Sequence, residues 1–134
     1  MNEPETGGGG ARAGGARRFG GALEKAYQFT LWLVPTVEKF PKSQRFLLGD
    51  RIQNTAIDVL EGLIEATYSR EAVGILTQVN LRLEKLRFFF RAAKDLRFID
   101  LRRYEYAARA IDEIGRLVGG WIKAGRGASA QPAV

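Results

Sequence analysis

The sequence contains neither cysteine nor histidine among its 134 residues. Without cysteine the chain has no disulfide, no thiolate ligand for a metal and no cysteine nucleophile. Without histidine it lacks the most common general base of enzymes and the most common protein ligand of transition metals. The sequence therefore predicts a protein that is not an enzyme, with no catalytic residues, no bound metal and no cofactor.

The acidic side chains and glycines do not supply a replacement site. Glu61 and Glu65 are four residues apart, and Asp58 precedes Glu61 by three, a spacing that could serve a two-metal site in a helical bundle. Such sites also need histidine or several further inward carboxylates, so a solvated helix face is the favoured interpretation. The glycine run at 7–10 is not followed by lysine and Ser/Thr, which excludes a phosphate-binding P-loop.

Long hydrophobic runs are also missing, and no segment resembles a signal peptide or a transmembrane span. We therefore expect a cytoplasmic protein without membrane contact. Residues 1–20 are rich in glycine and arginine, and residues 125–134 are small and polar. Both are predicted to be flexible tails, because they offer too little apolar surface to offset the entropy of ordering. The folded domain is expected over residues 21–124.

Within that domain, apolar residues recur at the three- and four-residue spacing of amphipathic helices, without the alternation typical of strands. Four such stripes are predicted to be buried. The first two are Leu23, Tyr27, Thr30, Val34 and Val37, and then Leu48, Ile52, Ala56, Val59, Leu63 and Ala66. The last two are Leu76, Val79, Leu83, Leu86, Phe90 and Ala93, and then Tyr104, Ala107, Ile111, Ile114, Val118 and Trp121.

Several residues predict where these helices begin, bend and end. Ser43, Ser69 and Asp100 are the expected N-caps of the second, third and fourth helices. Pro35 is expected to kink the first helix, and Gly125 to end the fourth. The links near residues 40–43, 67–70 and 97–100 are short, so consecutive helices must run antiparallel. The predicted fold is therefore all-α, an antiparallel up-down-up-down four-helix bundle.

Some apolar residues do not fit the four stripes. Ile57, Leu60 and Ile64 form a second row on the second helix, and Phe88 and Phe89 point away from the third stripe. One bundle core cannot bury three consecutive phenylalanines. The surplus predicts a homo-oligomer, and the alternative is a monomer with an exposed apolar patch.

The chain has 21 basic and 15 acidic residues. Residues 80–103 alone contain eight basic residues and three acidic ones. The candidate binding residues on the predicted third helix are Arg82, Lys85, Arg87, Arg91 and Lys94. Arg87, Arg91 and Lys94 share one face by their spacing, whereas Arg82 and Lys85 point elsewhere. Such a face can bind nucleic-acid phosphates, with weak sequence specificity because no base-reading element is visible. The alternative is a solvated stripe whose cations pair with neighbouring carboxylates.

Three stretches resemble a known family. LRFFFR at 86–91 and IGRLVGGWI at 114–122 resemble the accessory variability determinant (Avd) proteins of diversity-generating retroelements. PKSQRFLLGDR at 41–51 is similar to the wider group that also contains the four-helix-bundle proteins of ribosomal-RNA intervening sequences. The resemblance covers roughly residues 21–124, and its most specific motif is the Gly-x-x-x-Gly-Gly-Trp ending.

The resemblance implies a non-enzymatic four-helix bundle that assembles as a barrel-shaped homopentamer. It further implies binding to the reverse transcriptase of the retroelement and to RNA and DNA through a basic surface, in support of mutagenic retrohoming. The basic positions of the family fall on Arg87 and Arg91, while Arg82, Lys85 and Lys94 are added from the charge pattern. The alternative is an intervening-sequence protein of undefined role. A neighbouring reverse-transcriptase gene would favour the retroelement protein, whereas a location inside a ribosomal-RNA gene would favour the intervening-sequence protein.

Overall fold

Each of the four blocks of helical periodicity is a long helix in the computed structural model, which describes residues 20–130. These helices are α2 (Gly20–Glu38), α4 (Asp50–Thr67), α5 (Ala72–Asp95) and α6 (Leu101–Ala130). A single helical turn, α3 (Lys42–Gln44), and a π-helical segment, η1 (Arg45–Gly49), lead into α4 without a break. No strand occurs within this range. The predictions made for residues 1–19 and 131–134 lie outside the described residues.

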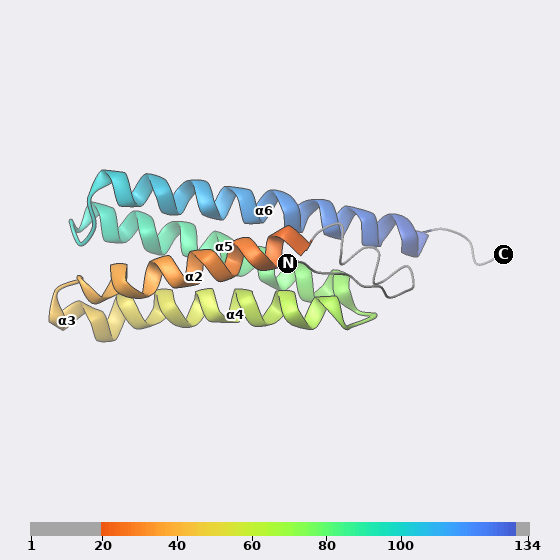
Figure 1. The fold of residues 1–134 in the computed structure, drawn as a ribbon, viewed down its shortest axis with the longest axis horizontal. Coiled ribbons are helices and arrows are strands. Elements are labelled where there is room, and N and C mark those ends of the chain that lie inside the picture. The colour runs from red at the N-terminus through yellow and green to blue at the C-terminus, as the bar shows by residue number, and fades with distance from the viewer. Residues whose placement is uncertain (1–19, 131–134) are drawn as a thin grey trace, which may run out of the picture.

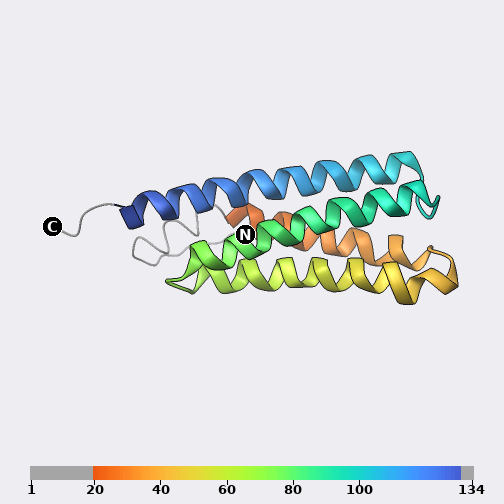
Figure 2. The same cartoon turned by 180° about the vertical axis from the view of Figure 1, so that it is seen from behind.

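The four long helices lie side by side with alternating direction (Figures 1 and 2). Helix α2 packs against α4 and α6, and α5 packs against the same two helices, which closes the bundle. The α2–α4 connection and the α5–α6 turn lie at the same end of the molecule (Figure 1), where the rings of Phe40 and Phe98 are 5.6 Å apart. The predicted four-helix bundle is thus confirmed for a single chain.

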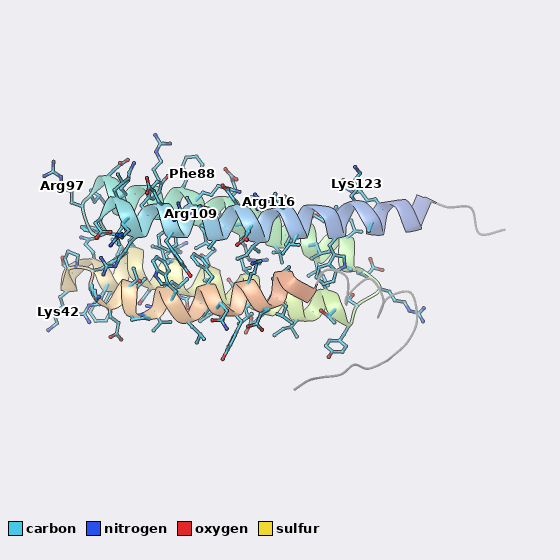
Figure 3. All side chains as sticks on the ribbon, turned by 45° about the horizontal axis from the view of Figure 1, so that its top comes forward. Lys42, Phe88, Arg97, Arg109, Arg116 and Lys123 are labelled. Atoms are coloured by element: carbon cyan, nitrogen blue, oxygen red, sulfur yellow. The ribbon has the colours of Figure 1, made fainter. Side chains whose placement is uncertain are left out.

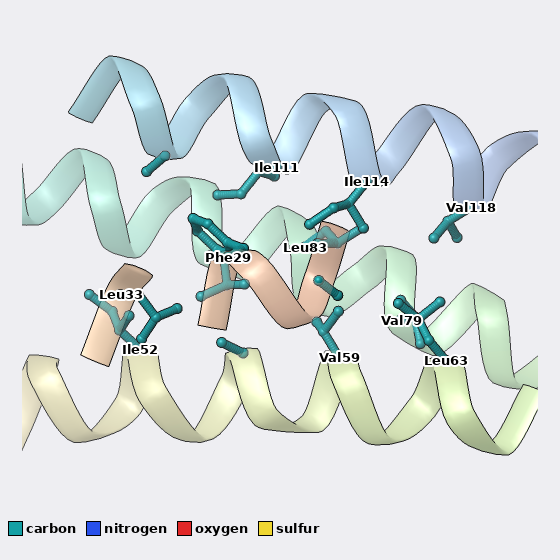
Figure 4. Packing of buried hydrophobic residues seen from close by; sticks show 14 of the residues in the cluster. Phe29, Leu33, Ile52, Val59, Leu63, Val79, Leu83, Ile111, Ile114 and Val118 are labelled. Carbon is teal, nitrogen blue, oxygen red and sulfur yellow. The ribbon is translucent and has the colours of Figure 1, made fainter. Parts of the chain in front are cut away.

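Most of the core comes from the stripes that the periodicity predicts on α4, α5 and α6, and one face of α2 completes it (Figure 4). Every predicted stripe residue of α5 is buried, as are those of α4 and α6 apart from Leu48 and Tyr104, which are partly buried. Burying these side chains removes apolar surface from water and is the main source of stability in such a bundle.

The predicted stripe on α2 was wrong except at Val37, which is buried. Tyr27 and Val34 are exposed, and the buried face is instead displaced by about one residue, a rotation of about 100°. That face comprises Ala22, Ala26, Phe29, Leu33, Thr36, Val37 and Phe40. Two alanines let α2 approach its neighbours closely, and the rings of Phe29 and Phe90 meet at 5.8 Å between centroids.

The helix ends follow the predictions only in part. Asp100 caps α6 as expected, because its Oδ1 accepts a hydrogen bond from the Arg103 N–H at 2.8 Å. Ser43 is not a cap, since the helical turn already begins at Lys42. The hydroxyl of Ser69 accepts from the Glu71 N–H in the turn before α5, and Glu71 is the N-cap.

Neither the internal proline nor the predicted terminal glycine ends its helix. Helix α2 continues through Pro35 to Glu38, although this proline has no N–H to donate to the carbonyl of Leu31. Helix α6 continues through Gly125, where we expected it to stop. A Cβ at Gly125 would lie 2.7 Å from Cγ2 of Val73, so this glycine permits close contact between α6 and the start of α5.

The surplus apolar residues follow the prediction only in part, because Leu60 and Phe89 pack against the core. Phe90 is buried, Phe89 is partly buried against the core, and Phe88 is 57% exposed. Ile57 and Ile64 are also exposed on α4. The single chain therefore leaves large apolar side chains in water on more than one helix.

Candidate nucleic-acid interface

The five basic residues predicted from the sequence all lie on α5, and Arg87 is the most firmly held of them. Its Nε is 3.2 Å from Oε1 of Glu84, and its Nη1 donates a hydrogen bond to Oδ1 of Asp112 on α6. The Arg87 side chain is only 38% exposed. This arginine therefore links α5 to α6 as well as offering charge to solvent.

Arg82 and Lys94 also contact neighbouring helices. The Nε of Arg82 lies 3.9 Å from Oδ2 of Asp58 on α4. The Nζ of Lys94 lies 3.5 Å from Oδ1 of Asp95 and 4.7 Å from the ring centre of Tyr104 on α6, a cation–π contact. Arg87 and Lys94 thus share the side of α5 that faces α6, whereas Arg82 faces α4, as the spacing predicted.

Lys85 and Arg91 are the most available cations of α5. Arg91 is 62% exposed, and its Nε lies 4.0 Å from Oδ2 of Asp95, the limit of an ion pair. Lys85 is exposed and makes no ion pair with any residue the structure describes. An exposed ion pair such as that of Arg91 contributes little to stability. Arg91 and the unpaired Lys85 can therefore turn toward a polyanion at small cost.

A second set of cations follows the outer face of α6. It consists of Arg102, Arg109, Arg116 and Lys123, called the α6 row below. The four residues are spaced by seven, so they lie nearly in line, with about 10 Å between neighbours and about 31 Å from first to last. Figure 3 shows Arg109, Arg116 and Lys123 in succession along the helix. All four are exposed, and none forms an ion pair within residues 20–130.

Two of the three carboxylates of α6 are engaged by cations of other helices. Asp112 accepts from Arg87 of α5, and Glu113 lies 3.3 Å from Nζ of Lys25 on α2. Cations from the neighbouring helices neutralise these two acids, so Glu105, between Arg102 and Arg109 in sequence, is the acidic residue of α6 that makes no ion pair within residues 20–130. A surface hollow of about 410 Å³ lies beside Arg109 and Arg116 and opens this part of the row to solvent.

The α6 row was not among the residues predicted from the sequence, because residues 104–134 have a small net charge as a block. The signal that identifies the row is the repeat of seven from Arg102 to Lys123. A repeat of seven keeps side chains on one face of a helix, since it amounts to almost two full turns. Net charge per segment does not detect such an arrangement.

The acidic candidates of α4 form no metal centre in the described structure. Asp58, Glu61 and Glu65 line one shallow hollow of about 260 Å³, which they share with Arg82. No group of three or more acidic side chains is arranged to hold a metal ion in the described region. The helices described are likewise too short or too polar for any of them to cross a membrane.

Comparison with known proteins adds one finding. The sequence model of a family described as bAvd-like matches residues 22–125, which covers all four long helices except the first residues of α2 and the last of α6. No curated protein matches the chain.

Proposed function

Because the chain belongs to the bAvd-like family, we propose that it is a non-enzymatic accessory protein of a diversity-generating retroelement. In this proposal it binds RNA and DNA together with the reverse transcriptase and so supports mutagenic retrohoming. The absence of cysteine and histidine supports a binding role, since few groups remain that could transfer protons near neutral pH.

The observation that best supports nucleic-acid binding is the α6 row. Unpaired arginines can donate two hydrogen bonds to phosphate oxygens, and a straight row on a rigid helix suits a regularly spaced phosphate backbone. With a rise of 3.4 Å per base pair, the row matches roughly nine base pairs of duplex. The interface we propose combines this row with the α5 cations, and Lys85 and Arg91 contribute most there because they are the most available.

Assembly into a homo-oligomer is part of the proposal, with five subunits taken from the family resemblance. The exposed apolar side chains support it, because rows of this kind are normally covered in a stable protein. They occur on all four long helices: Tyr27, Leu31 and Val34 on α2, Ile57 and Ile64 on α4, Leu81 and Phe88 on α5, and Leu101 and Tyr106 on α6. Light scattering should give several times the 14.9 kDa of one chain, and a stable monomer at micromolar concentration would contradict assembly.

Salt dependence of binding tests the nucleic-acid interface. The double variant Arg109→Gln/Arg116→Gln should bind duplex DNA more weakly and reduce the slope of log affinity against log salt by about 0.9 for each phosphate that it no longer neutralises. The matched control is Arg82→Gln/Arg87→Gln, which removes the same charge from cations already paired with carboxylates. In this control, the slope of log affinity against log salt should change by less than half of the change expected for Arg109→Gln/Arg116→Gln.

Two outcomes would contradict this assignment. An equal loss of binding in both double variants would mean that α5 contributes as much as α6, and unchanged binding in a well-folded α6 variant would exclude the row. Binding to the reverse transcriptase is tested separately, by copurification after nuclease treatment. If the polymerase uses the same basic surface, the α6 double variant should recover less of it than the α5 control does.

A further inference from the structure

A cavity at the end of the bundle is not explained by the interface above. It has a volume of about 460 Å³ and lies between the last turn of α2, the α5–α6 turn and the first turn of α6. Its lining residues are Thr36, Lys39, Lys94, Arg97, Phe98, Ile99, Asp100, Leu101 and Arg103. Four cations from three parts of the chain therefore surround one hollow together with a single carboxylate.

The single carboxylate is already engaged. Asp100 accepts from the Arg103 N–H at 2.8 Å and from the Arg103 Nη1 at 2.9 Å, so it both caps α6 and pairs with Arg103. Lys94 has one ion-pair partner, Asp95, which is outside the cavity lining, and its Nζ also lies over the ring of Tyr104. Lys39 and Arg97 make no ion pair with any described residue. The cavity consequently has an excess of positive charge that the described part of the chain does not neutralise.

The backbone at Arg97 points to the same conclusion. Helix α5 ends in a Schellman motif, in which the Phe98 N–H bonds to the Ala93 carbonyl at 2.8 Å and the Arg97 N–H to the Lys94 carbonyl at 2.9 Å. This motif needs a left-handed residue, and Arg97 has φ 66°. Glycine is the favoured residue here because a Cβ disfavours this conformation. An arginine at this position costs conformational energy, and its guanidinium makes no hydrogen bond or ion pair within residues 20–130 that would offset this cost.

The rest of the lining suits a nucleotide. Phe98, Ile99 and Leu101 supply an apolar wall, and Phe98 is held in place by its contact with Phe40. The volume is within the range of about 300 to 1,000 Å³ that is typical of small-ligand sites. Guanidinium groups bind phosphate oxygens in pairs, and lysines add charge. Figure 3 shows Arg97 at the tip of the bundle.

We propose that this cavity binds the phosphate of a nucleotide, either a free nucleotide or the terminal phosphate of a strand held along α6. The first residue of the α6 row, Arg102, directly precedes Arg103 of the cavity, so a strand on the row can end there. The strand-end source depends on the proposed nucleic-acid binding, whereas affinity of the cavity for phosphate does not.

Calorimetric titration with pyrophosphate tests the cavity itself. The variant Lys39→Gln/Arg97→Gly should bind pyrophosphate at least about tenfold more weakly, since charged hydrogen bonds to phosphate are removed. The Arg97→Gly substitution should not lower the melting temperature of this variant, because glycine adopts the left-handed conformation at position 97 without strain. The control Lys42→Gln removes a charge from α3, at the same end of the bundle but outside the cavity lining, and its affinity for pyrophosphate should stay within about twofold of the parent.

Oligonucleotides with and without a 5′-phosphate identify the source. Tighter binding of the phosphorylated strand, abolished in Lys39→Gln/Arg97→Gly, assigns the cavity to strand ends. Equal binding of both strands together with pyrophosphate binding assigns it to free nucleotides. Absence of pyrophosphate binding at millimolar concentration, or affinity that survives in the double variant, would overturn the proposal. Neither result would bear on binding of long duplexes by the α6 row, which the salt-dependence experiment measures independently.

Discussion

Helices α5 and α6 both present cations to solvent, yet the two sets differ in what surrounds them. On α5, Arg82 and Arg87 are matched by carboxylates of neighbouring helices. On α6, the row from Arg102 to Lys123 has no such partners in the described part of the chain. The helix with the denser run of basic residues in sequence is therefore the one whose charge is better neutralised in the fold.

This difference separates two uses of a basic side chain. A cation that pairs across a helix seam helps to hold the bundle together, and a polyanion must compete with its partner to bind it. A cation without a partner adds to the external field and can release counterions from nucleic acid. Stability measurements should therefore respond to α5, and binding measurements to α6.

The largest effect on stability should come from reversing Arg87. Arg87→Glu would place a carboxylate beside Glu84 and Asp112, removing two ion pairs and adding repulsion, so unfolding free energy should fall by about 1 kcal/mol. Urea denaturation measures the change. Arg109→Glu is the matched control on α6 and should stay within about 0.5 kcal/mol of the parent. Equal losses in the two variants would show that pairing does not distinguish the helices.

A smaller effect is expected from releasing Arg87 rather than removing it. Asp112→Asn deletes its partner on α6 and one negative charge beside the α6 row, so affinity for duplex DNA should rise about threefold or more at low salt. The control Glu61→Gln deletes the same charge from α4. Helix α6 packs against α2 and α5, so the control leaves the surroundings of the α6 row unchanged. An equal gain from both variants in a fluorescence-anisotropy titration would indicate that net charge alone, and not the freed arginine, governs binding.

The sequence predicted much of this fold, because on α4, α5 and α6 the stripe with three- and four-residue spacing is the face that the bundle buries. Helix α2 was the exception: its sequence is apolar around most of its circumference, so periodicity could not choose between Tyr27 with Val34 and Phe29 with Leu33. Packing decides that choice, since only one face lets the two alanines Ala22 and Ala26 approach the neighbouring helices. Such a decision depends on contacts between distant segments, which a local pattern does not contain.

The candidate site was predictable only as a set of cations. Spacing correctly placed Arg87 and Lys94 on a different face from Arg82. Their partners could not be predicted, because Asp58 and Asp112 lie on other helices and meet α5 only in the folded bundle. Arg97 illustrates the same limit: its left-handed backbone follows from the Schellman motif, whereas the sequence shows only an ordinary arginine.

The smallest predicted effect concerns Lys85, the cation on α5 that lacks an ion pair within residues 20–130. If pairing rather than helix identity decides the role of a cation, Lys85 should behave like a residue of the α6 row. Lys85→Gln should change unfolding free energy by less than about 0.5 kcal/mol and reduce the salt slope of DNA binding by about 0.9, the value for one phosphate. Arg82→Gln, from the preceding turn of the same helix, should show the opposite pattern: a loss of stability of up to about 0.5 kcal/mol and little change in slope. Urea denaturation measures the unfolding free energy of the two variants, and fluorescence anisotropy at several salt concentrations measures their salt slopes. If Lys85 instead follows Arg82 in both measurements, the contrast between the helices has a cause other than pairing.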